Sequence, residues 1–332
     1  MKFRLDLEIK KISPRISHTH KILLIGSCFT ENIGQKLELY KFTVLQNPNG
    51  ILFNPVSVAE AITSYIDQVL ISESSLFYYR EGWHSWKHHS RFSGITQEIA
   101  VEQINQSAMN AHKFLKNADW LVITLGSAWI YTLTENAPSA KKGDVAANNH
   151  KAPAEWFNRR LMSAPEVFEI LDGMMQKLKS ANPYLHVIFT ISPVRHIREG
   201  VVENNRSKAV LIQAVHQVVE KEENAYYFPA YELVIDDLRD YRFYAEDLVH
   251  PNYFATQYVW EKFVEACMDD NSRELMTELH DINLAYKHKA FNPGSTEHQK
   301  FLQTYLQKTK LLQEKYSYLD FQKEIEYFKR ET

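Results

Sequence analysis

Three side chains of the types that catalyse acyl transfer occur far apart in this sequence: Ser27, Asp247 and His250. In the segment DLVH the aspartate and the histidine are three residues apart, so the Asp247 carboxylate can accept a hydrogen bond from one imidazole nitrogen. The other nitrogen is then free to take a proton from a hydroxyl, which is a poor nucleophile without such a base. The sequence therefore predicts Ser27 as nucleophile, His250 as general base and Asp247 as the residue that orients His250.

Ser27 lies where an expected strand turns into an expected helix. Residues 21–27 (KILLIGS) form a short apolar run typical of a strand buried on both faces, and residues 28–40 have apolar side chains at helical spacing. The Ser27 N–H would then lie at the positive end of the helix, where it can stabilise an oxyanion. The alternative is that Ser27 only caps the helix, because serine is a favoured N-cap.

The alternation of strands and helices over residues 20–270 predicts an α/β domain with a mainly parallel sheet. Two further buried runs, residues 120–127 and 184–193, deliver Gly126-Ser127 and Arg195-His196 to the strand ends. Carboxyl ends of parallel strands meet at one edge, called the carboxyl edge below, so we expect these segments to converge there with DLVH. Residues 271–332 contain no strand-like run and predict a helical C-terminal extension, with a break at 292–295.

Several other residues are candidates for the same site. Gly50 in QNPNG permits close approach of its backbone N–H to an oxyanion, although a plain turn glycine explains it equally well. The aromatic stretch around residues 83–92 suggests a substrate wall, and the loop after the third buried strand suggests contacts with an anionic or carbohydrate substrate. The predicted substrate-binding residues are Trp83, His84, His88, His89, Arg195 and His196.

Three alternatives stay open. The Cys28 thiol, beside a helix N-terminus, could act with His250 in place of Ser27, since only one of the two neighbours can face the site. His84, His88 and His89 have spacing found in zinc sites but no nearby acidic ligand, so we favour the substrate wall. The third alternative is a binding protein that has the same fold but no catalytic activity.

Composition narrows the class of protein. The chain has 332 residues, with 38 Lys and Arg against 41 Asp and Glu and a net charge of −3, which predicts no nucleic-acid or membrane partner. Its two cysteines exclude a disulfide scaffold and a four-cysteine zinc site, and we expect neither metal nor cofactor. The charged N-terminus and the absence of a long apolar run predict a cytoplasmic location, and the C-terminal helices suggest a possible homodimer.

Segments from about residue 20 to 265 resemble the GSCFA-domain proteins, a branch of the SGNH (GDSL-like) hydrolase superfamily. The matching segments are GSCFTENIG (26–34), NPNGILFNP (47–55), WHSWKHHSRFSG (83–94), TLGSAWIY (124–131), SPVRH (192–196), NNRSKA (204–209) and FPAYELVIDDLRDYRFYAEDLVHP (228–251).

The resemblance implies a three-layer α/β/α sandwich with a five-stranded parallel sheet. It matches Ser27 to the nucleophile, Gly50 to an oxyanion-hole glycine, and Asp247 and His250 to the last block. Two departures stand out: Cys28 follows Ser27 in place of the usual Gly-Asp-Ser order, and Ala128 stands where the superfamily has an oxyanion-hole Asn. The donors that could replace that Asn are Asn148, Asn149 and Asn204.

Taken together, the sequence predicts a hydrolase domain over residues 1–270 and a helical extension over 271–332. The expected activity is that of a serine esterase that removes an acyl group, such as acetyl, from a carbohydrate or similar small substrate through an acyl-Ser27 intermediate. The alternative is a catalytically weak or inactive carbohydrate-binding protein of the same fold.

Overall fold

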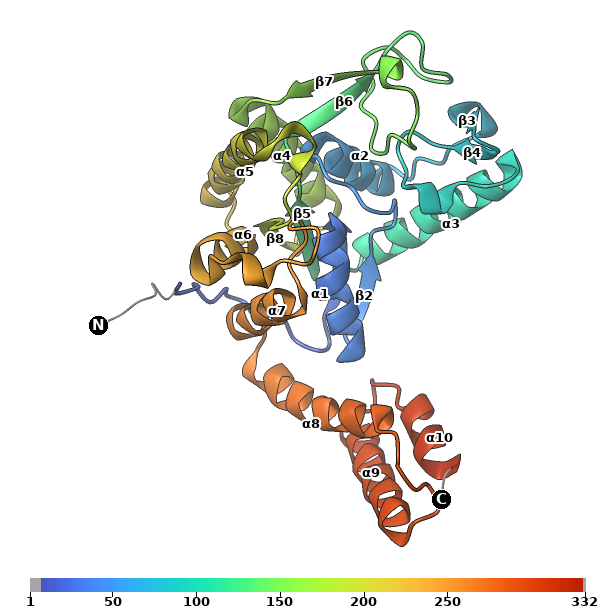
Figure 1. The fold of residues 1–332 in the computed structure, drawn as a ribbon, viewed down its shortest axis with the longest axis vertical. Coiled ribbons are helices and arrows are strands. Elements are labelled where there is room, and N and C mark those ends of the chain that lie inside the picture. The colour runs from blue at the N-terminus through green and yellow to red at the C-terminus, as the bar shows by residue number, and fades with distance from the viewer. Residues whose placement is uncertain (1–6, 331–332) are drawn as a thin grey trace.

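Five short strands form one parallel sheet at the centre of the molecule (Figure 1). The structure is a computed structural model that describes residues 7–330; the first six residues of the charged N-terminus lie outside the described residues. The strand order across the sheet is β2-β1-β5-β8-β9. The strands are β1 (Lys21–Gly26), β2 (Thr43–Gln46), β5 (Trp120–Leu125), β8 (His186–Ile191) and β9 (Ala225–Phe228).

The sheet is buried on both faces, which explains the continuous apolar runs of its three central strands. Successive side chains of a strand point to opposite faces, so in β1 Leu23 and Ile25 join one buried cluster while Ile22 and Leu24 join the other. The same division holds in β5 and β8. This arrangement confirms the predicted three-layer α/β/α architecture with a five-stranded parallel sheet.

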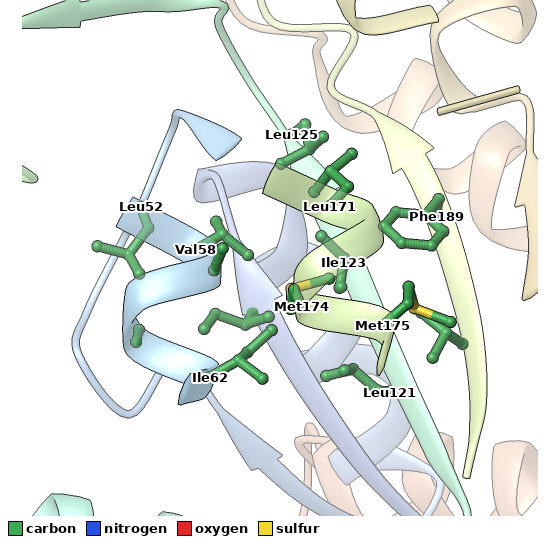
Figure 2. Close-up of a cluster of buried hydrophobic side chains, with 14 of the residues drawn as sticks. Leu52, Val58, Ile62, Leu121, Ile123, Leu125, Leu171, Met174, Met175 and Phe189 are labelled. Carbon is green, nitrogen blue, oxygen red and sulfur yellow. The ribbon is translucent and has the colours of Figure 1, made fainter. Parts of the chain in front are cut away.

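Helices cover each face of the sheet. One face carries α2 (Pro55–Ile66), α3 (Gln97–Leu115), α4 (Ala164–Ala181) and α5 (Val201–Lys221). The other carries α1 (Cys28–Leu39), the short α6 (Ala230–Glu232) and α7 (Tyr253–Cys267). Figure 2 shows the first core, where Val58 and Ile62 of α2 and Leu171 and Met174 of α4 pack over the β5 side chains.

The strand order creates one place where the chain changes direction across the sheet. From β1 the chain passes outward to the edge strand β2, and then returns past β1 to β5 and continues to β8 and β9. Helices α1 and α2 therefore lie on opposite faces, and the loops that leave β1 and β5 diverge. In open α/β sheets such a switch point is where ligands bind, which directs attention to the loops after Gly26 and Leu125.

Two small antiparallel hairpins extend beyond the sheet (Figure 1). The hairpin β3 (Phe77–Tyr79) and β4 (Gly82–His84) agrees with the loop or small hairpin expected there. The hairpin β6 (Trp129–Leu133) and β7 (Phe157–Leu161) follows Ser127, and the sequence analysis did not predict it. Its β7 strand reads FNRRL, largely exposed and without a clear apolar alternation, so the pairing is set by tertiary contacts.

The C-terminal residues form the predicted helices, α8 (Asp270–Lys287), α9 (Thr296–Lys315) and α10 (Gln322–Arg330), and the expected break separates α8 from α9. They bury a cluster of their own. Ion pairs connect them to the rest of the chain, Arg15 with Asp270 at 2.9 Å and Lys41 with Glu324 at 2.8 Å. Within residues 7–330, no helix combines the length and the apolar character needed to cross a membrane.

Candidate active site

The turn between β1 and α1 requires a glycine and buries the serine that follows it. Gly26 has φ +141°, and a Cβ built on it would lie 2.1 Å from the Thr124 carbonyl oxygen of β5. Ser27 has no exposed surface; its N–H donates to Thr124 O (3.1 Å) and its Oγ accepts from Phe29 N–H (3.3 Å). Ser27 is therefore the N-cap of α1, and its hydroxyl is buried, which disfavours the predicted role as nucleophile.

The backbone donors predicted for the oxyanion hole are also engaged elsewhere. The Ser27 N–H is taken by Thr124, and the Gly50 N–H donates to the Asn47 carbonyl at 2.7 Å. Gly50 has φ +79°, and a Cβ there would lie 2.1 Å from the Cβ of His89, so the turn itself requires glycine. The plain-turn interpretation of Gly50 is the one that the structure supports, and neither N–H is free to bind an oxyanion.

Cys28, the first residue of α1, is the partly exposed member of the Ser27–Cys28 pair. Its thiol is close to the N–H groups of Cys28 and Phe29 and to the Lys208 ammonium, all of which favour the thiolate. Burial has the largest effect and, with Glu31, raises the pKa of the Cys28 thiol above its ordinary value. The group is thus a thiol that needs a base.

Lys208 of α5 is a buried cation that the sequence analysis missed. Its Nζ donates to the carbonyls of Gly126 and Ser192, each at 2.7 Å, where β5 and β8 end. Burial lowers the pKa of Lys208 to about 7. A signal was present: Lys208 lies in one helical stripe with Leu211 and Val215, where a lysine among apolar residues is unusual.

The predicted pair of Asp247 and His250 forms. His250 Nδ1 lies 2.7 Å from Asp247 Oδ2, and Asp247 Oδ1 accepts the backbone N–H groups of Val249 (2.9 Å) and His250 (3.0 Å). These bonds, with the His250 ring, lower the pKa of the Asp247 carboxyl to about 2. Both side chains are about half exposed. Among the described residues, no hydrogen bond joins His250 to Ser27 or Cys28.

A cavity of about 430 Å³ lies at the carboxyl edge, beside the loop that carries His250. The Arg195 N–H donates to the Val249 carbonyl at 3.1 Å, which ties the loop after β8 to the DLVH loop. The His196 ring lies against Gly126 and forms an edge-to-face contact with Phe53. The cavity is lined by Phe53, Asn54, Ser127, Trp129, Tyr131, Ala146, Ala147, Asn148, Asn149, Arg195, His196, Ile197, Arg198 and Val249.

Of the six predicted substrate-binding residues, only Arg195 and His196 line this cavity. The other four lie outside this lining, in β4 and the segment that follows it, so the predicted substrate wall is not part of this cavity. Both nitrogens of His84 are bonded, to Ser93 Oγ and the Tyr79 carbonyl. His88 is buried with Nδ1 2.8 Å from Ser85 Oγ, His89 Nδ1 accepts the Arg91 N–H, and Trp83 packs in a small apolar cluster.

The asparagines considered as replacements for the missing donor have different surroundings. Asn148 and Asn149 line the cavity, whereas Asn204 is buried and its Oδ1 accepts the His196 N–H at 2.9 Å. The Ala128 N–H donates to Ser207 Oγ at 2.7 Å. Within the part of the chain that the structure describes, no group of three or more His, Cys, Asp or Glu side chains is placed to hold a metal ion.

Family models match most of the chain. One described as "GSCFA family" matches residues 21–263, and one described as "GSCFA domain protein, C-terminal domain" matches residues 279–332. A search of curated proteins found no significant match.

Similar solved structures include carbohydrate esterases. A family 3 carbohydrate esterase from Talaromyces cellulolyticus is 9% identical and covers 79% of this chain and 99% of its own, with a TM-score of 0.35. An acetyl xylan esterase from Butyrivibrio proteoclasticus is 9% identical and covers 75% of this chain and 64% of its own, with a TM-score of 0.39. A family 3 carbohydrate esterase from Clostridium thermocellum is 11% identical and covers 77% of this chain and 98% of its own, with a TM-score of 0.33. These likenesses are distant and carry no argument about activity.

Proposed function

The chain belongs to the GSCFA family, and we propose that it is a hydrolase that cleaves an acyl ester, such as an acetyl ester of a carbohydrate or a similar small polyol, at the carboxyl edge of the sheet. The observation that carries the proposal is the Asp247–His250 pair. Its 2.7 Å contact holds Nδ1, and no hydrogen bond within residues 7–330 engages Nε2. An imidazole oriented by a carboxylate, with its second nitrogen available beside a cavity, is the arrangement that a general base requires.

The nucleophile comes from the β1–α1 turn, and we favour Cys28 over the predicted Ser27. Cys28 is partly exposed at the start of a helix, while the Ser27 hydroxyl is fully buried and caps that helix. Because burial raises the pKa of the Cys28 thiol, the thiolate has to be generated by a base, which is the role proposed for His250. Ser27 is the alternative nucleophile, and it would have to leave its capping position.

The reaction then proceeds in two steps, acylation of Cys28 and hydrolysis of the thioester. His250 Nε2 takes the thiol proton as Cys28 Sγ bonds to the ester carbonyl, and the tetrahedral intermediate collapses with cleavage of the C–O bond. The alcohol leaves with the proton from His250, and the acyl group remains on Cys28 as a thioester. Water, deprotonated by His250, attacks the thioester, and the acid is released as the thiol regains its proton.

Two features near Cys28 suit the negative charge that develops on the carbonyl oxygen. Among the described residues no carbonyl accepts the Cys28 N–H, which lies at the N-terminus of α1. Lys208 Nζ is fixed nearby by the Gly126 and Ser192 carbonyls and adds a positive charge when it is protonated, although burial lowers its pKa to about 7. The DLVH loop must bring His250 closer to Cys28 when substrate binds, since catalytic hydrogen bonds often tighten only in the complex.

The test uses 4-nitrophenyl acetate with Cys28→Ala, Cys28→Ser and Ser27→Ala. We expect Cys28→Ala to abolish turnover and Ser27→Ala to retain it while losing about 1 kcal/mol of stability with the cap. Loss of turnover in Ser27→Ala with retention in Cys28→Ala would reverse the assignment. A wild type that is inert on short and long acyl esters and on acetylated sugars would favour the binding-protein alternative.

Alkylation gives a second readout that needs no substrate. The chain has two cysteines, and Cys267 is fully buried. Iodoacetamide should therefore modify Cys28 alone in the folded protein, and inactivation should follow that adduct in time. Full modification of Cys28 without loss of activity would exclude it as the nucleophile.

A further inference from the structure

The cavity at the carboxyl edge offers hydrogen-bond donors and positive charge. Arg195 and Arg198 both line it, and no aspartate or glutamate does so among the described residues. The chain as a whole has a net charge of −3, so this local excess does not reflect the overall composition. A concave site with unbalanced cations favours an anionic ligand.

The two guanidinium groups are positioned by aromatic rings. Arg195 lies over Tyr244 at 4.1 Å and over Tyr241 at 4.9 Å from the ring centroids, and Arg198 lies over Tyr131 at 5.6 Å. Neither arginine forms an ion pair with a carboxylate of the described residues. A stacked guanidinium keeps its N–H edge available for the two parallel hydrogen bonds that a carboxylate or phosphate accepts.

We infer that the ester substrate carries an anionic oxygen group, a carboxylate or a phosphate, which Arg195 and Arg198 bind in this cavity. The inference rests on the proposed function, since it names the substrate class of the same site. The cavity volume of about 430 Å³ is in the range of small-molecule sites.

His196 and Asn149 complete the donor set. The buried Nε2 of His196 has no hydrogen-bond partner in the described structure, and a buried polar atom without a partner points to a missing ligand group. Burial lowers the pKa of His196 to about 3, so the ring is neutral and can donate or accept one hydrogen bond. Asn149 also lines the cavity.

The cavity also lies in the right place for the proposed reaction. Val249 lines it and directly precedes His250, and its carbonyl accepts the Arg195 N–H. An anion held by Arg195 therefore places the attached ester next to the proposed base. The arginines position the substrate and take no part in bond making.

The test compares aryl acetates that carry an anionic or a neutral group at the para position. The probes are 4-acetoxybenzoate, the neutral 4-acetoxybenzamide and 4-acetoxyphenyl phosphate. We expect one of the anionic esters to have a kcat/KM roughly tenfold to a hundredfold above that of the amide, mainly through KM, because a charge-assisted hydrogen bond contributes that much binding. The preferred anion identifies carboxylate or phosphate as the recognised group.

Substitutions locate the effect. Arg195→Gln should remove most of the preference for the anionic ester, measured as the ratio of its kcat/KM to that of the amide, and Arg195→Lys should restore only part of this ratio, because lysine lacks the planar fork. Arg206→Gln is the matched control: Arg206 lies in α5 outside the cavity lining and is paired with Glu203 at 2.9 Å. Equal kcat/KM for all three esters, or a preference that survives Arg195→Gln and Arg198→Gln together, would overturn the inference.

A binding measurement separates this inference from the proposed function. Calorimetry with the products 4-hydroxybenzoate, 4-hydroxyphenyl phosphate and 4-hydroxybenzamide requires no turnover. Binding of an anionic product that Arg195→Gln weakens at least tenfold, in a protein that hydrolyses none of the esters, would support the anion site and reject the hydrolase. Turnover of the esters, with anionic and neutral products bound equally well, would support the hydrolase and reject the anion site.

Discussion

Two regions of this protein contain clustered histidines. They differ in how many of their polar groups have hydrogen-bond partners. The histidine network (His84, His88 and His150) is closed: in each ring at least one nitrogen has a partner within the network or its loops. The carboxyl-edge cluster (Arg195, His196 and His250) is open. Among the described residues, no group forms a hydrogen bond with the His196 Nε2, and no carboxylate forms an ion pair with Arg195.

This difference separates polar residues that stabilise the fold from those that are available to a ligand. A buried polar group that is fully hydrogen-bonded stabilises its surroundings, whereas one without a partner costs stability and is retained for another reason. The histidine network packs beneath hairpin β3–β4 against Trp86 and Phe77. Arg195 and His196 of the carboxyl-edge cluster line a cavity, and His250 follows the lining residue Val249, so the same side-chain types serve structure in one region and, as we propose, chemistry in the other.

The largest expected effect of any substitution in the two regions is that of His250→Ala on turnover. If His250 is the general base, kcat on 4-nitrophenyl acetate should fall by about 10²–10⁴-fold. The thermal midpoint should hardly change, because the side chain is about half exposed. Equal kcat in wild type and variant would remove His250 from the mechanism and, with it, the contrast between the two regions.

Gly50→Ala tests the contact between the Asn47–Gly50 turn and His89, which directly follows His88 of the histidine network. The new Cβ would lie 2.1 Å from the His89 Cβ at a backbone φ of +79°. Because both the clash and the conformation oppose folding, we expect a loss of more than about 2 kcal/mol in the free energy of unfolding, measured in urea. A loss below 0.5 kcal/mol would mean that the turn relaxes freely.

His150→Ala is the structural counterpart of His250→Ala. His150 Nε2 bonds to the Ser85 carbonyl at 2.9 Å and Nδ1 to Ser90 Oγ at 3.2 Å, and both partners would be left without it. The free energy of unfolding should fall by about 1–3 kcal/mol, while kcat per folded molecule stays within a few fold. A large loss of kcat with unchanged stability would place the histidine network in the active site.

The smallest effect concerns Lys208 and depends on pH. Its pKa is about 7 in the folded protein and near 10.4 in an unfolded chain, so between these values the unfolded state binds the extra proton. Stability must then rise with pH across that window, by at most about 1.4 kcal/mol per pH unit. Urea titrations at pH 7.5 and 9 should show this rise in wild type relative to Lys208→Met; identical slopes would mean that Lys208 stays protonated.

The main strands could be predicted from sequence because both faces of the sheet are buried. The runs KILLIG, WLVITL and HVIFTI have no polar interruption apart from threonine and the starting Lys and His residues, and the structure has strands at all three. The β6–β7 hairpin was missed because its strands are short and half exposed. The helical stretch after residue 270 was recognisable from its lack of strand-like runs.

The site was only partly predictable, for a physical reason. The Asp247–His250 contact depends on local spacing, which sequence reveals. The orientation of Ser27 and Cys28 depends on how the β1–α1 turn meets Thr124, and the isolation of His84 and His88 from the cavity depends on their contacts with distant loops. The position of Lys208 in an apolar helical stripe was a signal, but its partners are backbone carbonyls, which the sequence does not identify.

Trapping of the acyl-enzyme tests the central claim most directly. Wild-type protein mixed with 4-nitrophenyl acetate, quenched in acid and digested, should yield one peptide heavier by a single acetyl group, with fragmentation that assigns the acetyl to Cys28. The label should be absent from the Cys28→Ala variant. Acetyl found on Ser27, or scattered over exposed lysines with none at the β1–α1 turn, would contradict the account.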